Sequence, residues 1–152
     1  MRRVSILALP VLALLACLPP LLADLSRARA ERNLERRARL ALENASGQVK
    51  LASKSYGAGN WAATQSALEE VLESVELASE SLAAAVKNPR NSRSYKNLEV
   101  RTREILKHLG ALDERMSFDE RQKVEEIVER IRKLHDDALW AVMGGSPGRG
   151  SK

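Results

Sequence analysis

Two histidines, one cysteine and a series of arginines are the residues whose chemistry could define a function in this chain of 152 residues. A Cys₂His₂ or Cys₄ zinc site needs at least two cysteines, so the single Cys17 excludes both, as it excludes an intramolecular disulfide. The di-iron pattern of helical proteins needs Glu-x-x-His on two helices. Glu104 lies four residues before His108, and no acidic residue lies three residues before His135. The sequence therefore predicts no metal site and no cofactor.

Serine, histidine and aspartate all occur, but not in an order typical of nucleophilic catalysis. No serine lies in a glycine-rich elbow, and no glycine-rich loop of the phosphate-binding kind occurs. The segment Gly57-Ala58-Gly59 lies between two predicted helices, so we interpret it as a turn. We therefore expect no catalytic residue and a protein that is not an enzyme.

Arginine is the remaining candidate for a binding function. Arg29, Arg32, Arg36 and Arg39 follow one another at steps of three and four, which would place them on one face of a helix. This stripe predicts contact with anionic lipid headgroups or another polyanion, at about 1 kcal/mol per residue near a charged membrane. The alternative is a solvated helix face, partly neutralised by neighbouring glutamates.

The first 23 residues resemble an export signal. Met1-Arg2-Arg3 is a basic start, and the twenty residues of 4–23 carry no charge. We expect cleavage after Ala23, and therefore an exported protein that is periplasmic or secreted. Because export removes the protein from the cytoplasm, nucleic acid is not an expected partner.

Two alternatives for this segment remain open. Leu14-Leu15-Ala16-Cys17 resembles the bacterial lipoprotein box, in which Cys17 would be lipidated and tether the protein to a membrane. Twenty apolar residues also suffice for an uncleaved membrane anchor.

Apolar periodicity predicts four helices in 24–143 and a disordered tail in 144–152. The first helix is the longest, at about 24–55, and its start at 24–32 is expected to project as an arm. Asn44, Ser46 and Gly47 are weak helix formers, so we expect a bend or soft spot there, but no break, because the apolar stripe continues past them. The other three are predicted at about 60–87, 91–116 and 117–143. Asn60 is the expected N-cap of the second helix, and Ser117 and Glu120 form a capping box before the fourth.

The predicted fold is all-α, an antiparallel up-down-up-down four-helix bundle with a long first helix, because the connections are too short for any other neighbour. The formal charges of the four helical regions alternate as +4, −4, +3 and −2, which favours a ring in which only diagonal helices are alike. This topology predicts an aromatic cluster of Tyr56, Trp61 and Phe118 at one end. Tyr95 and Trp140 are predicted at the other end.

Two stretches resemble known protein groups. The 87–143 region, with Asn88-Pro89-Arg90 and the closing His135-Asp136-Asp137, resembles uncharacterised exported helical proteins of bacteria. This resemblance implies an envelope location and a helical fold. Met116-Ser117-Phe118-Asp119-Glu120-Arg121-Gln122 is similar to the Leu-Thr-x-x-Gln motif of periplasmic stress chaperones, which implies the shielding of unfolded clients.

These observations give two hypotheses. The first is a non-enzymatic, exported helical bundle that serves as a binding or structural module of the cell envelope. Its partner would be another protein, a second copy or an anionic membrane surface. The second is a periplasmic chaperone or accessory protein. The two differ in one property, because a closed bundle buries its apolar stripes whereas a chaperone exposes a large apolar surface.

Overall fold

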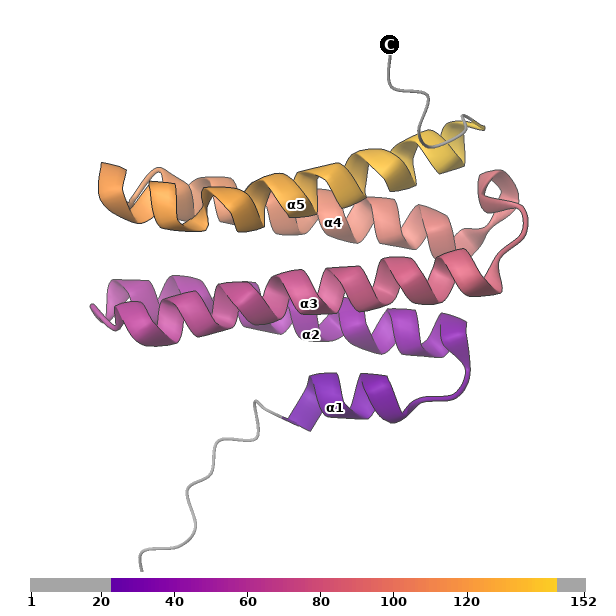
Figure 1. Cartoon of the computed structure of the whole chain (residues 1–152), viewed down its shortest axis with the longest axis horizontal. Helices are drawn as coiled ribbons and strands as arrows, with labels where there is room; N and C mark the ends of the chain where they lie inside the picture. The colour runs from indigo at the N-terminus through magenta and orange to yellow at the C-terminus, as the bar shows by residue number, and fades with distance from the viewer. Residues whose placement is uncertain (1–22, 145–152) are drawn as a thin grey trace, which may run out of the picture.

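The computed structural model describes residues 23–144, and this part of the chain is all-helical (Figure 1). Its elements are α1 (Ala23–Ala30), α2 (Leu34–Gly57), α3 (Trp61–Ala85), the short 3₁₀ helix η2 (Pro89–Asn91), α4 (Arg93–Asp113) and α5 (Phe118–Met143). The last three long helices match their predicted ranges to within a few residues. The export signal with Cys17, and the tail beyond residue 144, lie outside the described residues.

The prediction of one long first helix is wrong, because the chain turns back at residues 31–33. Asn33 is the N-cap of α2, and its side chain accepts a hydrogen bond from the Arg36 backbone N–H at 2.9 Å. The Glu31 carboxylate in turn accepts from the Asn33 N–H at 3.0 Å. The start of the chain does not project as an arm, since α1 packs on α2 and buries Leu25 and Ala28.

The four long helices form two antiparallel hairpins, α2 with α3 and α4 with α5. The hairpins lie against each other, so that α2 contacts α4 and α3 contacts α5. In Figure 1, α3 and α5 form the front layer, and α2 and α4 lie behind them. The direct contact between α3 and α4 is smaller than any of these.

This arrangement corrects the predicted ring of alternating charges. The neighbours α2 and α4 both carry more basic than acidic residues, five against two and five against three. The other layer is acidic, because α3 carries five glutamates and no basic residue and α5 carries seven acidic and five basic residues. Helices of like charge therefore lie side by side, and the molecule has a basic layer and an acidic layer.

The apolar stripes predicted from the sequence form the core. Small residues dominate the seam between α2 and α3, where Ala45, Ala52 and Ala67 are buried and let the two helices approach closely. The α4 and α5 hairpin supplies larger side chains, including Ile105 and Ile131, which are 1% and 0% exposed.

The predicted aromatic clusters are found in part. The Tyr56 and Trp61 rings meet edge to face at 6.5 Å. Phe118 does not complete this cluster as a buried residue, because it is 77% exposed. Trp140 lies near the end of α5, at the opposite end of the molecule from the start of α3 (Figure 1).

A bilayer-spanning helix would have to be both long and apolar. Among residues 23–144, no helix meets both conditions.

Candidate anion-binding face

The four arginines of the predicted stripe do not share one helix face, because the turn at 31–33 divides them. Arg29 lies on α1 and pairs with Glu73 of α3, Nη2 to Oε2 at 2.8 Å. Arg32 lies in the turn and is exposed. Arg36 and Arg39 lie on α2 and line a groove toward α4. The structure therefore keeps two of the four arginines together.

This groove, of about 640 Å³, lies between the first turns of α2 and α4 and is named here the upper groove. Its third basic residue is Arg93 at the start of α4, which the sequence reasoning missed. Ser94 ties the two helices together, since its hydroxyl donates to Glu35 at 2.9 Å. The rest of its lining is polar at Asn33 and Asn97 and apolar at Ala38, Leu42 and Leu82.

The arginines of the upper groove keep donors for an anion. Arg36 contacts Glu31 at 3.1 Å, and Arg39 reaches Glu43 only at 3.9 Å. No ion pair of Arg93 occurs within residues 23–144. A guanidinium has five N–H donors, so one carboxylate contact leaves most of them available to a phosphate or carboxylate ligand.

A second groove of about 460 Å³, the lower groove, lies between the same two helices nearer their other ends. Lys50 and Lys54 of α2 line it together with His108 of α4 and Arg115. Arg115 crosses toward α2 and donates to the Ser53 hydroxyl at 3.3 Å. The two grooves give the α2–α4 layer a basic surface, named here the basic face.

The like charge of α2 and α4 explains why this seam is open. Two basic side chains that face each other repel, and within residues 23–144 no ion pair joins α2 to α4. The hydrogen bonds that join α2 to α4 or to the turn after it include those of Ser94 to Glu35, Arg115 to Ser53 and Tyr56 to the Arg115 carbonyl. A bound anion would supply the missing negative charge.

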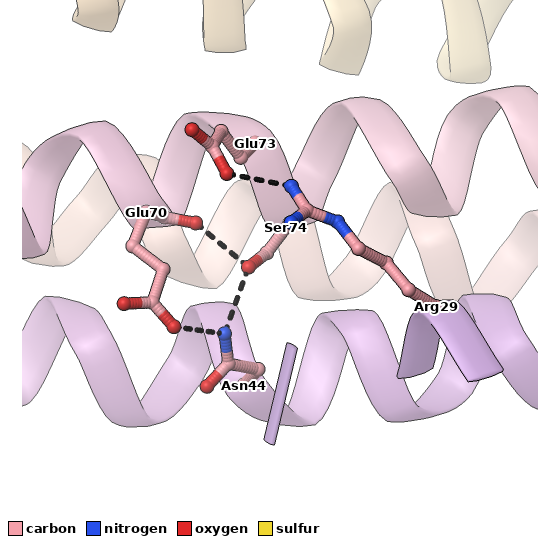
Figure 2. A network of polar contacts seen from close by, with 5 residues as sticks. All are labelled: Arg29, Asn44, Glu70, Glu73 and Ser74. Atoms are coloured by element: carbon pink, nitrogen blue, oxygen red, sulfur yellow. Dashed lines mark hydrogen bonds and ion pairs between the residues drawn. The ribbon is translucent and has the colours of Figure 1, made fainter. Parts of the chain in front are cut away.

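A second polar cluster joins α1, α2 and α3 (Figure 2). The Asn44 side-chain amide donates to Glu70 Oε1 at 2.9 Å and to Ser74 Oγ at 3.0 Å. Ser74 donates its own proton to the Glu70 backbone carbonyl at 2.7 Å. Figure 2 shows the Arg29 to Glu73 ion pair beside these contacts.

This cluster has a structural role. Because the Ser74 hydroxyl proton is held by a carbonyl, the side chain is not an activated nucleophile. Asn44 is 4% exposed and Ser74 is 0% exposed, and each supplies a partner to the other. A buried amide of this kind fixes the register of two helices, because any slip would leave it unsatisfied.

The two histidines lie on different helices and have different surroundings. His108 is exposed beside the lower groove. His135 is half-buried, and its Nδ1 lies 3.0 Å from the Thr102 hydroxyl. Among the described residues no three histidine, cysteine, aspartate or glutamate side chains gather as a metal site.

Local hydrogen bonds shift the pKa of two glutamates. The Asn33 backbone N–H lowers the pKa of Glu31, and the Ser117 backbone N–H lowers the pKa of Glu120. The Glu120 contact is the reciprocal half of the predicted capping box, at 2.9 Å. Partial removal from water is the main cause that raises the pKa of Tyr56 and of Tyr95. None of these groups lies at the centre of the basic face.

No family model, no curated protein and no solved structure matches the chain.

Proposed function

We propose that the protein is a non-enzymatic binding module of the cell envelope whose basic face binds anionic groups. The observation that carries the proposal is the upper groove, where Arg36, Arg39 and Arg93 converge between two helices of like charge. In this proposal the four long helices form one antiparallel up-down-up-down bundle, with α1 as a flap on α2. Export rests on the basic and apolar start of the sequence, and lipidation of Cys17 or an uncleaved anchor stays an alternative to cleavage after Ala23.

The ligand class follows from the donors. Guanidinium groups and side-chain amides recognise phosphate and carboxylate oxygens through several short hydrogen bonds. The two grooves lie along one seam, so an extended polyanion fits the basic face better than a small ion does. Phosphate-bearing polymers and anionic headgroups of the envelope have this chemistry. Nucleic acid is not the proposed ligand, since an exported protein does not meet it in the cell.

The second hypothesis, a chaperone for unfolded clients, has less support. The apolar stripes of the long helices are buried against one another, as a closed bundle requires. Among the described residues the large exposed apolar side chains are Val100, Phe118, Leu139, Trp140 and Met143. Phe118 begins α5, whereas Leu139, Trp140 and Met143 lie near its other end, so these side chains do not form one large client-binding surface.

Titration of the full chain with inorganic polyphosphate tests the binding. The variant R36Q/R39Q/R93Q should bind at least about tenfold more weakly, since each charged contact is worth on the order of 1 kcal/mol. The control K107Q/R132Q/K133Q removes the same charge from exposed positions outside the grooves and should bind like the wild type. Equal losses in both variants would show that net charge, and not the groove, binds the anion.

Cell fractionation tests the location. The protein should be found with the envelope or outside the cell, and mass spectrometry of its N-terminus should identify cleavage, lipid at Cys17 or an intact start. Recovery in the cytoplasm would overturn the envelope assignment and make nucleic acid a ligand to consider.

A further inference from the structure

The last turn of α5 exposes apolar side chains to water. Leu139, Trp140 and Met143 are 37%, 59% and 67% exposed, whereas the adjacent Ala138 is 3% exposed and faces the core. These side chains lie within five consecutive residues of one helix, so they form a patch and not scattered exposures. Met143 ends α5, directly before the described residues end at Gly144.

The surroundings of this patch are basic. Residues 81–98, which end α3, form η2 and begin α4, contain no aspartate or glutamate. This segment instead exposes four basic side chains, Lys87, Arg90, Arg93 and Lys96. The two features touch, because α5 packs against η2 and the Arg90 Cδ would lie 3.4 Å from a Cβ at Gly144.

The end of α5 that carries the patch adds no acidic residue to these basic surroundings. Its nearest acidic residues, Asp136 and Asp137, precede the patch, and the stretch from 138 to 144 is uncharged. In Figure 1 the end of α3, the start of α4 and the end of α5 meet at the same end of the molecule. This end, with its patch and its four basic residues, is named here the docking end.

We propose that the docking end binds the surface of an anionic membrane, with Trp140 and Met143 entering the headgroup region while Lys87, Arg90 and Lys96 contact lipid phosphates. This inference rests on the proposed function in part, since Arg93 belongs to both surfaces. Tryptophan prefers the membrane interface, and basic residues beside apolar ones are typical of proteins that lie on anionic lipid. A soluble polyanion would use the basic residues but would leave Trp140 in water.

A second copy fits this end less well than a membrane does. In a two-fold contact each copy presents the same surface, so the four basic residues of both chains would face one another. Like charges in such a contact oppose association. An anionic bilayer offers negative charge and an apolar layer at the depth where both features can be satisfied.

Tryptophan fluorescence of the full chain tests the proposal. The chain has two tryptophans, so W61F leaves Trp140 as the only reporter, and residues 1–22 contain none. Vesicles of equal parts phosphatidylglycerol and phosphatidylcholine should shift Trp140 emission to shorter wavelength, and lipids brominated on their acyl chains should quench it. Pure phosphatidylcholine should do neither. The control W140F, which reports from Trp61 at the other end, should show no shift.

Two substitution sets separate the contributions. W61F with M143Q, or with K87Q/R90Q/K96Q, should raise the apparent Kd for the mixed vesicles at least about tenfold. The matched control is W61F with F118Q, which removes an apolar side chain that is 77% exposed, against 67% for Met143, from the far end and should leave the Kd unchanged.

The outcomes distinguish this inference from the proposed function. Binding of vesicles without a change at Trp140 would overturn the docking end, while retained polyphosphate binding would leave the proposed function standing. A wild-type protein that binds neither vesicles nor polyphosphate would overturn both the docking end and the proposed function. Iodide quenches the fluorescence of tryptophans that are exposed to water. Weak quenching of Trp140 before lipid is added would mean that the patch is already covered, and would also overturn the docking end. Shielding that depends on protein concentration would assign a second copy to the patch, and shielding that does not would assign a segment of the same chain.

Discussion

Thr102 of α4 and His135 of α5 meet across their hairpin, with 3.0 Å between the hydroxyl Oγ1 and the ring Nδ1. Thr102 is 0% exposed, and its hydroxyl also donates to the Leu98 carbonyl at 2.8 Å. When the hydroxyl proton points to that carbonyl, the threonine oxygen accepts from His135 in the tautomer that carries its proton on Nδ1. The pair therefore joins the two helices of the hairpin and orients the His135 ring.

Thr102→Val should lower the free energy of unfolding by about 1 kcal/mol, because valine has nearly the same shape but no acceptor for the ring. Chemical denaturation of the variant checks this. In a His135→Leu background, Thr102→Val should lower the free energy of unfolding by less, because the imidazole that contacts Thr102 is already absent. Equal costs in both backgrounds would assign the loss to the Leu98 bond alone.

Asn44 and Ser74 should be energetically coupled. Asn44→Ala and Ser74→Ala each remove the contact between the two side chains, so the double variant should lose less stability than the two single losses together. We expect a coupling of about 1 kcal/mol from a double-mutant cycle measured by denaturation. Asn44→Ala combined with Thr102→Val serves as the unlinked pair and should be additive.

Ile105→Asp should abolish the cooperative thermal transition, because it places an unpaired charge at a core position that is 1% exposed. Circular dichroism against temperature is the measurement. Lys107→Asp changes an exposed position of the same helix and should keep the transition. An Ile105→Asp variant with an unchanged transition would show that α4 is rotated relative to the structure.

Stability should fall in acid through Glu31 and Glu120. The folded chain lowers the pKa of both carboxyls, so their contribution is complete above the unfolded pKa of about 4.3. It is lost as the pH falls below that value and through the folded pKa. The variant E31Q/E120Q should therefore show a shallower decline of unfolding free energy below pH of about 4.3 than the wild type does. Parallel curves would contradict the assigned shifts.

Asn33→Ala should free α1 more than it unfolds the molecule. Loss of the N-cap costs about 1 kcal/mol at the first turn of α2. Hydrogen exchange should accelerate at the Ala28 and Arg29 backbone amides, which lie in the hydrogen-bonded part of α1, while the core of α4 keeps its protection. Asn60→Ala is the matched control, since it removes the equivalent cap of α3 at 3.1 Å and should leave α1 protected.

The sequence predicted three of the four long helices because their apolar stripes are uninterrupted. It failed at residues 31–33, where arginines at helical spacing continue across a turn, and where Asn33 is the same kind of N-cap that was identified at Asn60. Spacing alone cannot distinguish a solvated face from the two sides of a turn. Leu25 and Ala28 could have indicated the turn, because a helix that projects into water has no need of apolar residues to bury, and both are buried here.

Asn44 shows a second limit of sequence reasoning. Asparagine is a weak helix former, so a bend or soft spot was predicted there, but no break in the helix. The structure confirms that α2 continues through the segment; what the sequence did not identify is that α3 supplies the partners of Asn44. Arg93 was missed for a related reason, because only the packing of α4 on α2 brings it to Arg36 and Arg39.

The separation of basic and acidic helices into two layers gives the molecule an electric dipole that runs across the layers. Such a molecule experiences a torque near any charged surface, and the torque acts before contact is made. An extended polyanion would be drawn toward the α2–α4 layer and away from the α3–α5 layer. Productive encounters would then be more frequent than random collision allows, and dissolved salt would reduce this gain over distances beyond about 10 Å.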